Sequence, residues 1–285
     1  MLPIWGDGPV TRDDYNRMMT KLPAAFASAP RRTVAHNSTN LGAREVPEET
    51  PIALTYGRTA YAVMMATPAD IEDFAVGFSL TERIIEDAAE IAELEIVAVP
   101  QGIEARMNLS SNRDVELVSR RRRLTGPAGC GLCGIESLEA AVAPLTYVES
   151  SAQFSADAIF QALGSMRDRQ TLNARTHAVH AAGFWSENHF VALREDVGRH
   201  NALDKVAGAL ARAKVSAASG VLVMSSRLSI ELVQKAAAIG CPVIVAVSAP
   251  TALALRAADE SGMTVIAVAR GDSFEIFTHA ERIGT

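Results

Sequence analysis

Residues 221–268 read VLVMSSRLSIELVQKAAAIGCPVIVAVSAPTALALRAADESGMTVIAV, and they carry the clearest secondary-structure pattern in the chain. Short, valine-rich apolar runs predict buried strands at 221–224, 243–247 and 265–268. Longer patterns with helical periodicity predict helices at 228–239 and 250–261, ended by Gly240 and Gly262. Strands that alternate with helices over short connections predict a parallel sheet with right-handed crossovers.

The segments that follow these strands are small and polar. In open α/β sheets, ligands bind beyond the carboxyl ends of the strands. Here those ends carry SSR at 225–227, SAPT at 248–251 and RGDS at 270–273. Hydroxyl groups, arginines and exposed helix N–H groups suit a phosphate, so we expect an anionic ligand along this edge. The alternative is that these residues are ordinary helix caps without a ligand.

The chain before this stretch supplies more α/β elements. The pattern predicts a helix at 156–166, strands at 176–185 and 189–193, a polar loop at 195–201 and a helix at 202–213. The loop and the following helix hold a dense set of polar residues, Asp196, Arg199, His200, Asn201 and Asp204. They suit a ligand's base or ribose, or the supply of an acid; the alternative is a solvated loop with a capped helix.

The first part of the chain predicts a smaller unit. A hairpin at 52–56 and 60–65, a helix that starts at Thr67–Asp70, and strands at 94–99 and 105–109 indicate an α+β domain. Residues before it have poor periodicity and predict a mobile arm with one short helix at 13–21. The predicted organisation is a flexible arm at 1–44, a small α+β domain at 45–118 and an α/β domain at 119–285.

Bulk composition narrows the function classes. The net charge of −6 argues against a general nucleic-acid binder. No apolar run reaches the roughly 18 residues of a membrane span, and the first residues lack the features of a secretory signal. Three cysteines do not make a disulfide framework. We therefore expect a cytoplasmic protein whose thiols are reactive or bind metal.

Two of the three cysteines, Cys130 and Cys133, lie in the stretch RRRRLTGPAGCGLCGIESLE at 120–139. Glycines surround both thiols, arginines precede them, and an apolar helical pattern begins after Gly134. Arginines and a helix N-terminus favour thiolate over thiol, and the thiolate is the nucleophile. The alternative for Arg120–Arg123 is a solvated run, but their position before the thiols favours docking of a phosphate or an acidic partner.

The cysteine pair allows several interpretations. A thioredoxin-like dithiol normally follows a strand, whereas here an arginine run and a turn precede it. A zinc site needs about four ligands, for which Cys241, His180 and His279 are the candidates, although the expected deaminase signature is out of order. A sulfur carrier, whose thiolate accepts and passes on a sulfane sulfur, is the third interpretation. Cys241 itself begins a predicted core strand and reads as a buried apolar residue.

Several segments together resemble one family. They are ATPADIEDFAVGFSLTERII at 66–85, GCGLCG at 129–134, EDVGRHNALDKV at 195–206, SSRLSIELVQKAA at 225–237, AVSAPTALALRAA at 246–258 and FTHAERI at 277–283. They are similar to the FdhD family of sulfur carriers required for formate dehydrogenase activity. Their number and order make the resemblance specific, and it covers roughly residues 45–283.

The resemblance implies a function. A cysteine desulfurase would hand sulfur to Cys130 as a persulfide, with Cys133 assisting, and the protein would pass it to the molybdenum cofactor, bis(molybdopterin guanine dinucleotide), for formate dehydrogenase. GDP would then mimic part of the bound cofactor. The family's cofactor-binding stretch falls on Val268, Ala269, Arg270, Gly271, Asp272 and Ser273. From the residues themselves we add Ser225, Arg227, Ser248, Arg199 and His200 to this site, and no metal ligands.

The resemblance also implies a fold and an assembly. The expected fold is a cytidine-deaminase-like, three-layer α/β domain with a mixed, largely parallel sheet and a small N-terminal α+β domain. Family members are expected to be cytoplasmic homodimers that contact neither nucleic acid nor membrane. Two alternative functions remain: a molybdenum-cofactor chaperone that transfers no sulfur, and a zinc-dependent, deaminase-like hydrolase.

Overall fold

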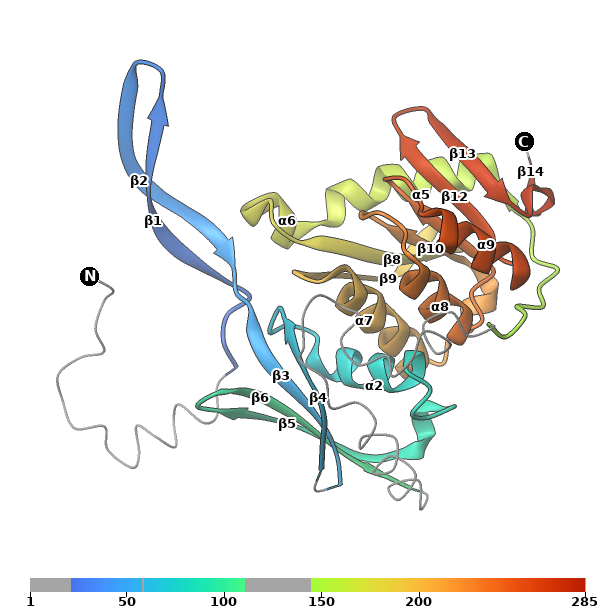
Figure 1. Ribbon diagram of the computed structural model, residues 1–285, viewed down its shortest axis with the longest axis horizontal. Coiled ribbons are helices and arrows are strands. Elements are labelled where there is room, and N and C mark those ends of the chain that lie inside the picture. The colour runs from blue at the N-terminus through green and yellow to red at the C-terminus, as the bar shows by residue number, and fades with distance from the viewer. Residues whose placement is uncertain (1–21, 58, 111–144, 285) are drawn as a thin grey trace.

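The structure is a computed structural model that describes residues 22–57, 59–110 and 145–284. Among these residues the largest sheet, here the large sheet, has six strands in the order β13-β12-β11-β10-β8-β9 (Figure 1). Its strands are β8 (His180–Ser186), β9 (His189–Asp196), β10 (Val221–Met224), β11 (Val243–Ala246), β12 (Thr264–Arg270) and β13 (Ser273–Thr278). The mixed α/β class predicted from the sequence is confirmed.

The large sheet is parallel at its centre and antiparallel at both sides. Strand β10 pairs in parallel with β11, and β11 with β12, as the sequence predicts. The pairs β9–β8, β8–β10 and β12–β13 are antiparallel, so the expectation of a largely parallel sheet is wrong. The reason is connection length: β8 meets β9 through Glu187 and Asn188, both with positive φ, and such a tight turn reverses the chain.

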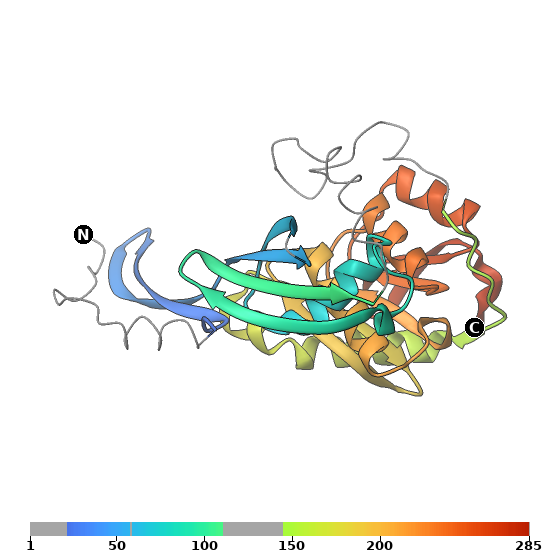
Figure 2. The same cartoon turned by 90° about the horizontal axis from the view of Figure 1, so that it is seen from below.

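Helices cover both faces of the large sheet, which gives the three layers expected (Figure 2). One face packs against α7 (Arg199–Arg212), α8 (Ile230–Ala238) and α9 (Ala252–Glu260), with Leu203, Leu232 and Ala254 in that core. The other packs against α5 (Ala156–Arg169), where Ile159 and Met166 meet Val221 and Val223.

Short elements complete this unit, and one differs from the sequence prediction. They are β7 (Phe154–Ser155), α6 (Thr171–Thr176), β14 (Ile283–Gly284) and 3₁₀ turns at Ala217–Ser219 and Ala280–Arg282. Of residues 176–179, predicted as strand, Thr176 instead ends α6, and the others connect α6 to β8, with His177 at φ 55. The Glu195 carboxylate stabilises α6, because it accepts hydrogen bonds from Leu172 N and Asn173 N in the first turn, at 2.8 Å each.

The small sheet has the order β4-β3-β6-β5 and packs one face against helix α2. Its elements are β3 (Thr50–Tyr56), β4 (Thr59–Ala66), α2 (Ile71–Thr81), a 3₁₀ turn at Ala88–Glu90, β5 (Ile91–Val99) and β6 (Gly102–Leu109). The predicted hairpin and strands are confirmed. The predicted helix start is wrong: α2 begins after Asp70, and the Thr67 hydroxyl instead accepts a hydrogen bond from Val197 N.

Helix α2 crosses α7 closely enough for the two backbones to touch. A Cβ atom added at Gly77 would lie 1.7 Å from the Asp204 carbonyl oxygen, and one added at Gly208 would lie 1.9 Å from the Asp73 carbonyl oxygen. Larger side chains cannot fit at either position, so glycine is required there. The small sheet and the large sheet therefore share one helical interface.

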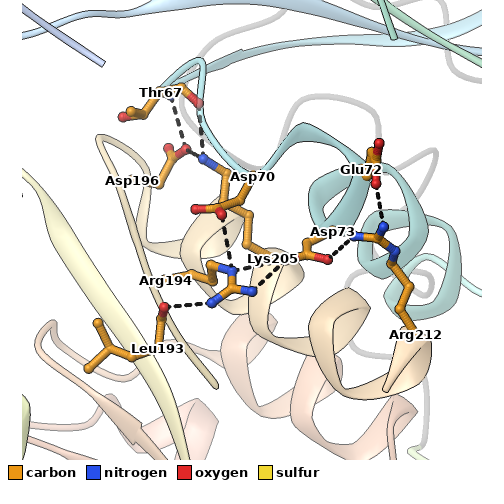
Figure 3. A network of polar contacts seen from close by, with 9 residues as sticks. All are labelled: Thr67, Asp70, Glu72, Asp73, Leu193, Arg194, Asp196, Lys205 and Arg212. Atoms are coloured by element: carbon orange, nitrogen blue, oxygen red, sulfur yellow. Dashed lines mark hydrogen bonds and ion pairs between the residues drawn. The ribbon is translucent and has the colours of Figure 1, made fainter. Parts of the chain in front are cut away.

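A buried polar network also joins the two parts (Figure 3). Lys205 Nζ lies 2.7 Å from Asp196 Oδ2, with both side chains fully buried, and donates to the Thr67 carbonyl oxygen at 2.9 Å. Asp73 on α2 accepts from Arg194 of β9 and Arg212 of α7. Buried charges are tolerated when they are paired in this way, so these contacts fix the two parts together.

Residues before the small sheet form a hairpin, where the sequence predicted a mobile arm. Strands β1 (Phe26–Ala35) and β2 (Ser38–Pro47) pair along their whole length and project from the body in both views (Figures 1 and 2). The arm prediction is therefore wrong for these strands. The predicted helix at 13–21 and the cysteine loop at 120–139 lie outside the described residues, and the domain boundaries stay predictions.

Candidate functional site

The carboxyl ends of the central strands meet at one edge of the large sheet, as predicted. Val247 N donates to the Met224 carbonyl oxygen at 3.0 Å, and Val268 N donates to the Ser248 carbonyl oxygen at 3.2 Å. Ser225 closes the edge toward β8, because its Oγ accepts a hydrogen bond from Ala181 N at 2.8 Å. Successive strand ends are thus held in contact, and we call this the strand-end edge.

Three arginines come to the strand-end edge from different elements. Arg199 opens α7, Arg227 follows β10, and Arg270 ends β12, where its Nε donates to the Val247 carbonyl oxygen at 3.2 Å. His180, at the start of β8, lies beside two of them: burial lowers its pKa first, and the charges of Arg199 and Arg227 lower it further. A neutral histidine among guanidinium groups leaves this edge positive and suited to an anion.

The predicted cofactor stretch, residues 268–273, is a bulge followed by a tight turn. The register of β12 and β13 shifts between Ala267 and Arg270, and Val268 adopts φ 53, which is rare for a β-branched residue. Gly271, with φ 63, turns the chain into β13. Such bulges and unusual backbone angles cluster at functional sites, and they support a role for this segment.

Not every predicted residue of that stretch presents its side chain. Arg270, Gly271, Asp272 and Ser273 are exposed, but the Ala269 side chain is buried in the core against α5 and Val268 packs against the opposite core. Val268 and Ala269 can therefore contact a ligand through their backbone groups. Arg270, Asp272 and Ser273 can contact a ligand through their side chains.

Buried polar atoms without partners gather at the first turns of α7 and α8. The Nε2 atom of His200 lies 3.9 Å from Oε2 of Glu231. These two atoms, together with Nε of Arg199 and Oγ of Ser229, are buried and lack a hydrogen-bond partner in the described part of the chain. Polar groups left in this way need a ligand or water, so the cluster extends the candidate site. Arg199 and His200 were predicted from the sequence as members of the site, whereas Ser229 and Glu231 were not.

The protonation of His200 gives a testable pH dependence. Burial, helped by Arg199 and Lys235, lowers the pKa of His200 from 6.5 to about 4. Between pH 6.5 and about 4, His200 is protonated in the unfolded chain but neutral in the folded protein. The free energy of unfolding therefore decreases as the pH falls through this range. The loss at pH 4 should be about 3 kcal/mol.

We expect a His200→Gln variant to lose stability less steeply than the unchanged protein over that range, since glutamine does not titrate. Urea unfolding at half-unit pH intervals measures the slope. The exposed His189, replaced in the same way, is the matched control and should keep the original slope. An unchanged slope in His200→Gln would contradict the assignment.

The polar constellation predicted to bind a ligand serves mainly to position the chain. Asp196 Oδ1 accepts from Gly198 N at 2.8 Å and from Asn201 Nδ2 at 2.9 Å, which fixes the backbone immediately before Arg199. Asp204 is buried and pairs with Lys235 at 3.0 Å. These carboxylates are held by partners within the protein, so their suggested ligand-binding or acid role stays a prediction, and Arg199 and His200 remain available from the same segment.

Two buried lysines were not singled out from the sequence. Lys205 holds Asp196, and Lys235 donates to Thr81, Glu82 and Asp204. A signal was present, because each lysine follows the helical period of the apolar face instead of the solvent face. These residues fix α7 and α8, whose first turns line the site.

The zinc ligands suggested from the sequence do not come together. His180 lies at the strand-end edge, whereas Cys241 lies at the opposite end of the large sheet, next to the start of β11. His279 contacts Asp259 and Glu281. Within the described ranges no group of three His, Cys, Asp or Glu side chains could hold a metal ion. Burial raises the pKa of the Cys241 thiol to about 11, so it is a structural residue.

Among the described residues, no helix is both long and apolar enough to cross a bilayer.

The chain is similar to known proteins over most of its length. Residues 47–284 match the FdhD/NarQ family. A protein of Agrobacterium fabrum named sulfur carrier protein FdhD is 48% identical over 270 residues, which cover 93% of this chain and 99% of the relative. A protein of the same name from Brucella abortus is 50% identical over 242 residues, covering 84% and 90%.

The fold has a solved counterpart. The crystal structure of a candidate formate dehydrogenase accessory protein from Desulfotalea psychrophila superposes with a TM-score of 0.72 at 25% identity, covering 91% of this chain and 99% of that one. The match of the family over most of the chain, the two relatives and this structure agree with the resemblance carried by the sequence motifs. The protein therefore belongs to the FdhD/NarQ family.

Proposed function

We propose that this protein is a sulfur carrier that takes a sulfane sulfur from a cysteine desulfurase and passes it to the molybdenum cofactor, bis(molybdopterin guanine dinucleotide), for use by formate dehydrogenase. Membership of the FdhD/NarQ family supports the carrier role, as do relatives named sulfur carrier protein FdhD. The link to formate dehydrogenase draws on the Desulfotalea psychrophila protein, described as an accessory protein of that enzyme.

The observation that carries the cofactor half of the proposal is the positive strand-end edge. Three arginines reach this edge from separate elements: Arg199, Arg227 and Arg270. Buried polar atoms of His200 and Glu231 nearby lack a hydrogen-bond partner among the described residues. Phosphates of a guanine dinucleotide suit the guanidinium groups, because arginine donates paired hydrogen bonds to phosphate oxygens. Ser248 and the turn at 270–273 complete the proposed site, and GDP is a suitable probe for part of it.

The sulfur half of the proposal rests on the cysteine pair. Cys130 thiolate attacks the outer sulfur of the desulfurase persulfide, so one S–S bond forms, one S–S bond breaks, and the desulfurase cysteine leaves as a thiolate. When an acceptor takes the outer sulfur, the acceptor supplies the electron pair for the new bond to that sulfur, the S–S bond to Cys130 breaks, and Cys130 leaves as a thiolate. Cys133 is proposed to assist this release. The buried Cys241, with its raised pKa, has no part in it.

Other features of the proposal follow from the family. We propose that the protein works in the cytoplasm, that it acts as a homodimer, and that the large sheet with its helices corresponds to a cytidine-deaminase-like domain. The three layers and the parallel centre of the sheet are compatible with that domain.

Removing one arginine tests the site. We expect Arg227→Gln to weaken GDP binding by roughly 10-fold or more, because a charge-assisted hydrogen bond contributes about 1.5–3 kcal/mol. The same variant should activate formate dehydrogenase poorly at limiting cofactor. Isothermal titration with GDP and an activation assay measure the two effects.

Arg256→Gln, on the exposed surface of α9, removes the same charge away from the strand-end edge and is the matched control. Equal GDP affinity in the two variants would place the nucleotide elsewhere and overturn the proposed site.

A further inference from the structure

The β1–β2 hairpin lacks a second layer. All residues from 30 to 44 are exposed, and the hairpin is anchored at its base, where Arg175 pairs with Glu45 and stacks on Phe26 at 3.7 Å. A two-stranded ribbon by itself is marginally stable in water, because cross-strand pairs contribute less than ordering the chain costs. We therefore expect the hairpin to be stabilised by packing against another surface.

One face of the hairpin is apolar with a basic residue in it. Side chains that are paired across the strands, or two apart along a strand, share a face. The register places Pro30 opposite Ala43, Arg32 opposite Leu41, and Val34 opposite Thr39 on one face. Val34 and Leu41 are 73% and 80% exposed, although they are large apolar residues. We call this face, residues 30, 32, 34, 39, 41 and 43, the arm face.

A second uncovered surface lies on the small sheet, on the face away from α2. There Val63 and Met65 of β4 are 59% and 47% exposed, beside Ala53 of β3. The same row continues into Glu104 of β6, which is aligned with Ala53. In the described part of the chain this face leaves Val63 and Met65 exposed, and we call it the outer sheet face.

The acidic part of the outer sheet face extends onto β5. Glu93 and Glu95 are exposed there, and Arg106 pairs with Glu95 and Glu104. The face therefore has an apolar half on β3–β4 and a half with a net negative charge on β5–β6.

The arm face and the outer sheet face both carry exposed apolar residues, and their charges are of opposite sign. The arm face sets Arg32 opposite Leu41, and the outer sheet face carries Val63 and Met65 on β4 with Glu104 two strands away on β6, in the row through Ala53. Residues 27–44 hold no acidic residue, and of their arginines Arg32 lies on the arm face, whereas Arg31 and Arg44 lie on the opposite face of the hairpin. Apolar contact with flanking opposite charges is the pattern of a specific interface.

The arm face and the outer sheet face do not meet within one chain. Strand β2 continues through Glu48 and Glu49 into β3, and the hairpin leads away from the small sheet (Figure 1). Two copies related by a twofold axis can satisfy both surfaces at once, each hairpin lying on the other copy. Reciprocal exchange of this kind forms a closed, isologous dimer.

We propose that the β1–β2 hairpin is an exchange arm that docks its arm face on the outer sheet face of a second copy of this chain. The proposal goes beyond sulfur transfer, and it concerns a surface separate from the strand-end edge. It assigns a task to the exposed apolar residues Val34, Leu41, Val63 and Met65, which otherwise face water.

Photocrosslinking of the full chain tests the contact without adding cysteines to a protein that already has reactive ones. A benzophenone amino acid replaces Val34, and this chain is mixed with an isotope-labelled chain of natural sequence, so that crosslinks between copies are recognised by mass. We expect crosslinks between the copies that map to β3 or β4. The same probe at Leu253, an exposed residue of α9, is the matched control and should give no such product.

Charge reversal is the second experiment that tests the proposal. Arg32→Glu should raise the dimer dissociation constant at least about 10-fold in analytical ultracentrifugation, and Glu95→Arg in the same chain should restore part of the loss. Arg256→Glu is the control and should leave the constant unchanged. A monomeric full chain, crosslinks from arm to arm or within one chain, or an unaltered dimer in Arg32→Glu would each overturn the proposal. None of these outcomes bears on GDP binding or on Cys130.

Discussion

A Cys130→Ala variant is expected to bind GDP as tightly as the unchanged protein and to yield no active formate dehydrogenase. The sulfur-carrying thiol is gone, whereas the arginines of the strand-end edge remain. A lost nucleophile abolishes a covalent transfer instead of slowing it slightly, so activity should fall to the level measured without the protein. The activation assay and GDP titration, made on the same preparation, check both halves of the expectation.

The other cysteines supply the controls. Cys133→Ala should reduce activation without abolishing it, since the proposed role of Cys133 is to assist. Cys241→Ala should keep activation, because the pKa of this buried thiol is raised to about 11 and it forms no thiolate at neutral pH. Full activation by Cys130→Ala would instead favour a cofactor chaperone that transfers no sulfur.

Replacing Lys205 by methionine should give the largest loss of stability, about 3–5 kcal/mol. The ammonium group is fully buried, lies 2.7 Å from Asp196 Oδ2 and donates to the Thr67 carbonyl oxygen. Methionine fills a similar volume but leaves the Asp196 carboxylate buried without its counter-charge. Since Asp196 also fixes the start of α7, the loss should extend to GDP binding through Arg199.

Urea unfolding measures this effect. Lys214→Met, at an exposed position just beyond α7, is the matched control and should change stability by less than about 0.5 kcal/mol. The double variant Lys205→Met with Asp196→Asn should be less unstable than Lys205→Met alone, because the unpaired charge is removed. A stable Lys205→Met single variant would contradict the view that this pair joins the two parts of the fold.

The centre of the fold was predictable from the sequence because its signals are local. Strands 221–224 and 243–246 are continuous apolar runs, and glycines follow the helices between them. The sides of the large sheet were less predictable. Whether β13 returns beside β12 depends on a two-residue turn after Arg270, and that turn and its pairing depend on long-range contacts.

The first turns of the helices show where local signals mislead. Thr67, Pro68 and Asp70 carry the composition of a helix start, yet Thr67 binds the loop after β9 instead. Its partners, Val197 and Asp196, lie about half the chain away in sequence, so no local pattern reveals them. The hairpin at 26–47 was not predicted, because its strands are mostly exposed and lack the alternation of apolar and polar residues that identifies a half-buried strand.

The candidate site was predicted in part for a general reason. Parallel strands bring their carboxyl ends to one edge, so Arg227, Ser248 and Arg270 could be placed together before the structure. Glu231 could not be placed there, because an acidic residue in the first turn of a helix normally reads as a cap. Its position opposite His200 depends on how α7 and α8 pack.

Mass spectrometry of the peptide that holds both Cys130 and Cys133, after incubation with a cysteine desulfurase and cysteine, tests whether sulfur is carried on Cys130. We predict a gain of one sulfur mass on that peptide, located on Cys130 by fragmentation, removed by reducing agent and absent from Cys130→Ala. An unmodified peptide, with the sulfur mass absent or found on Cys241, would contradict the account.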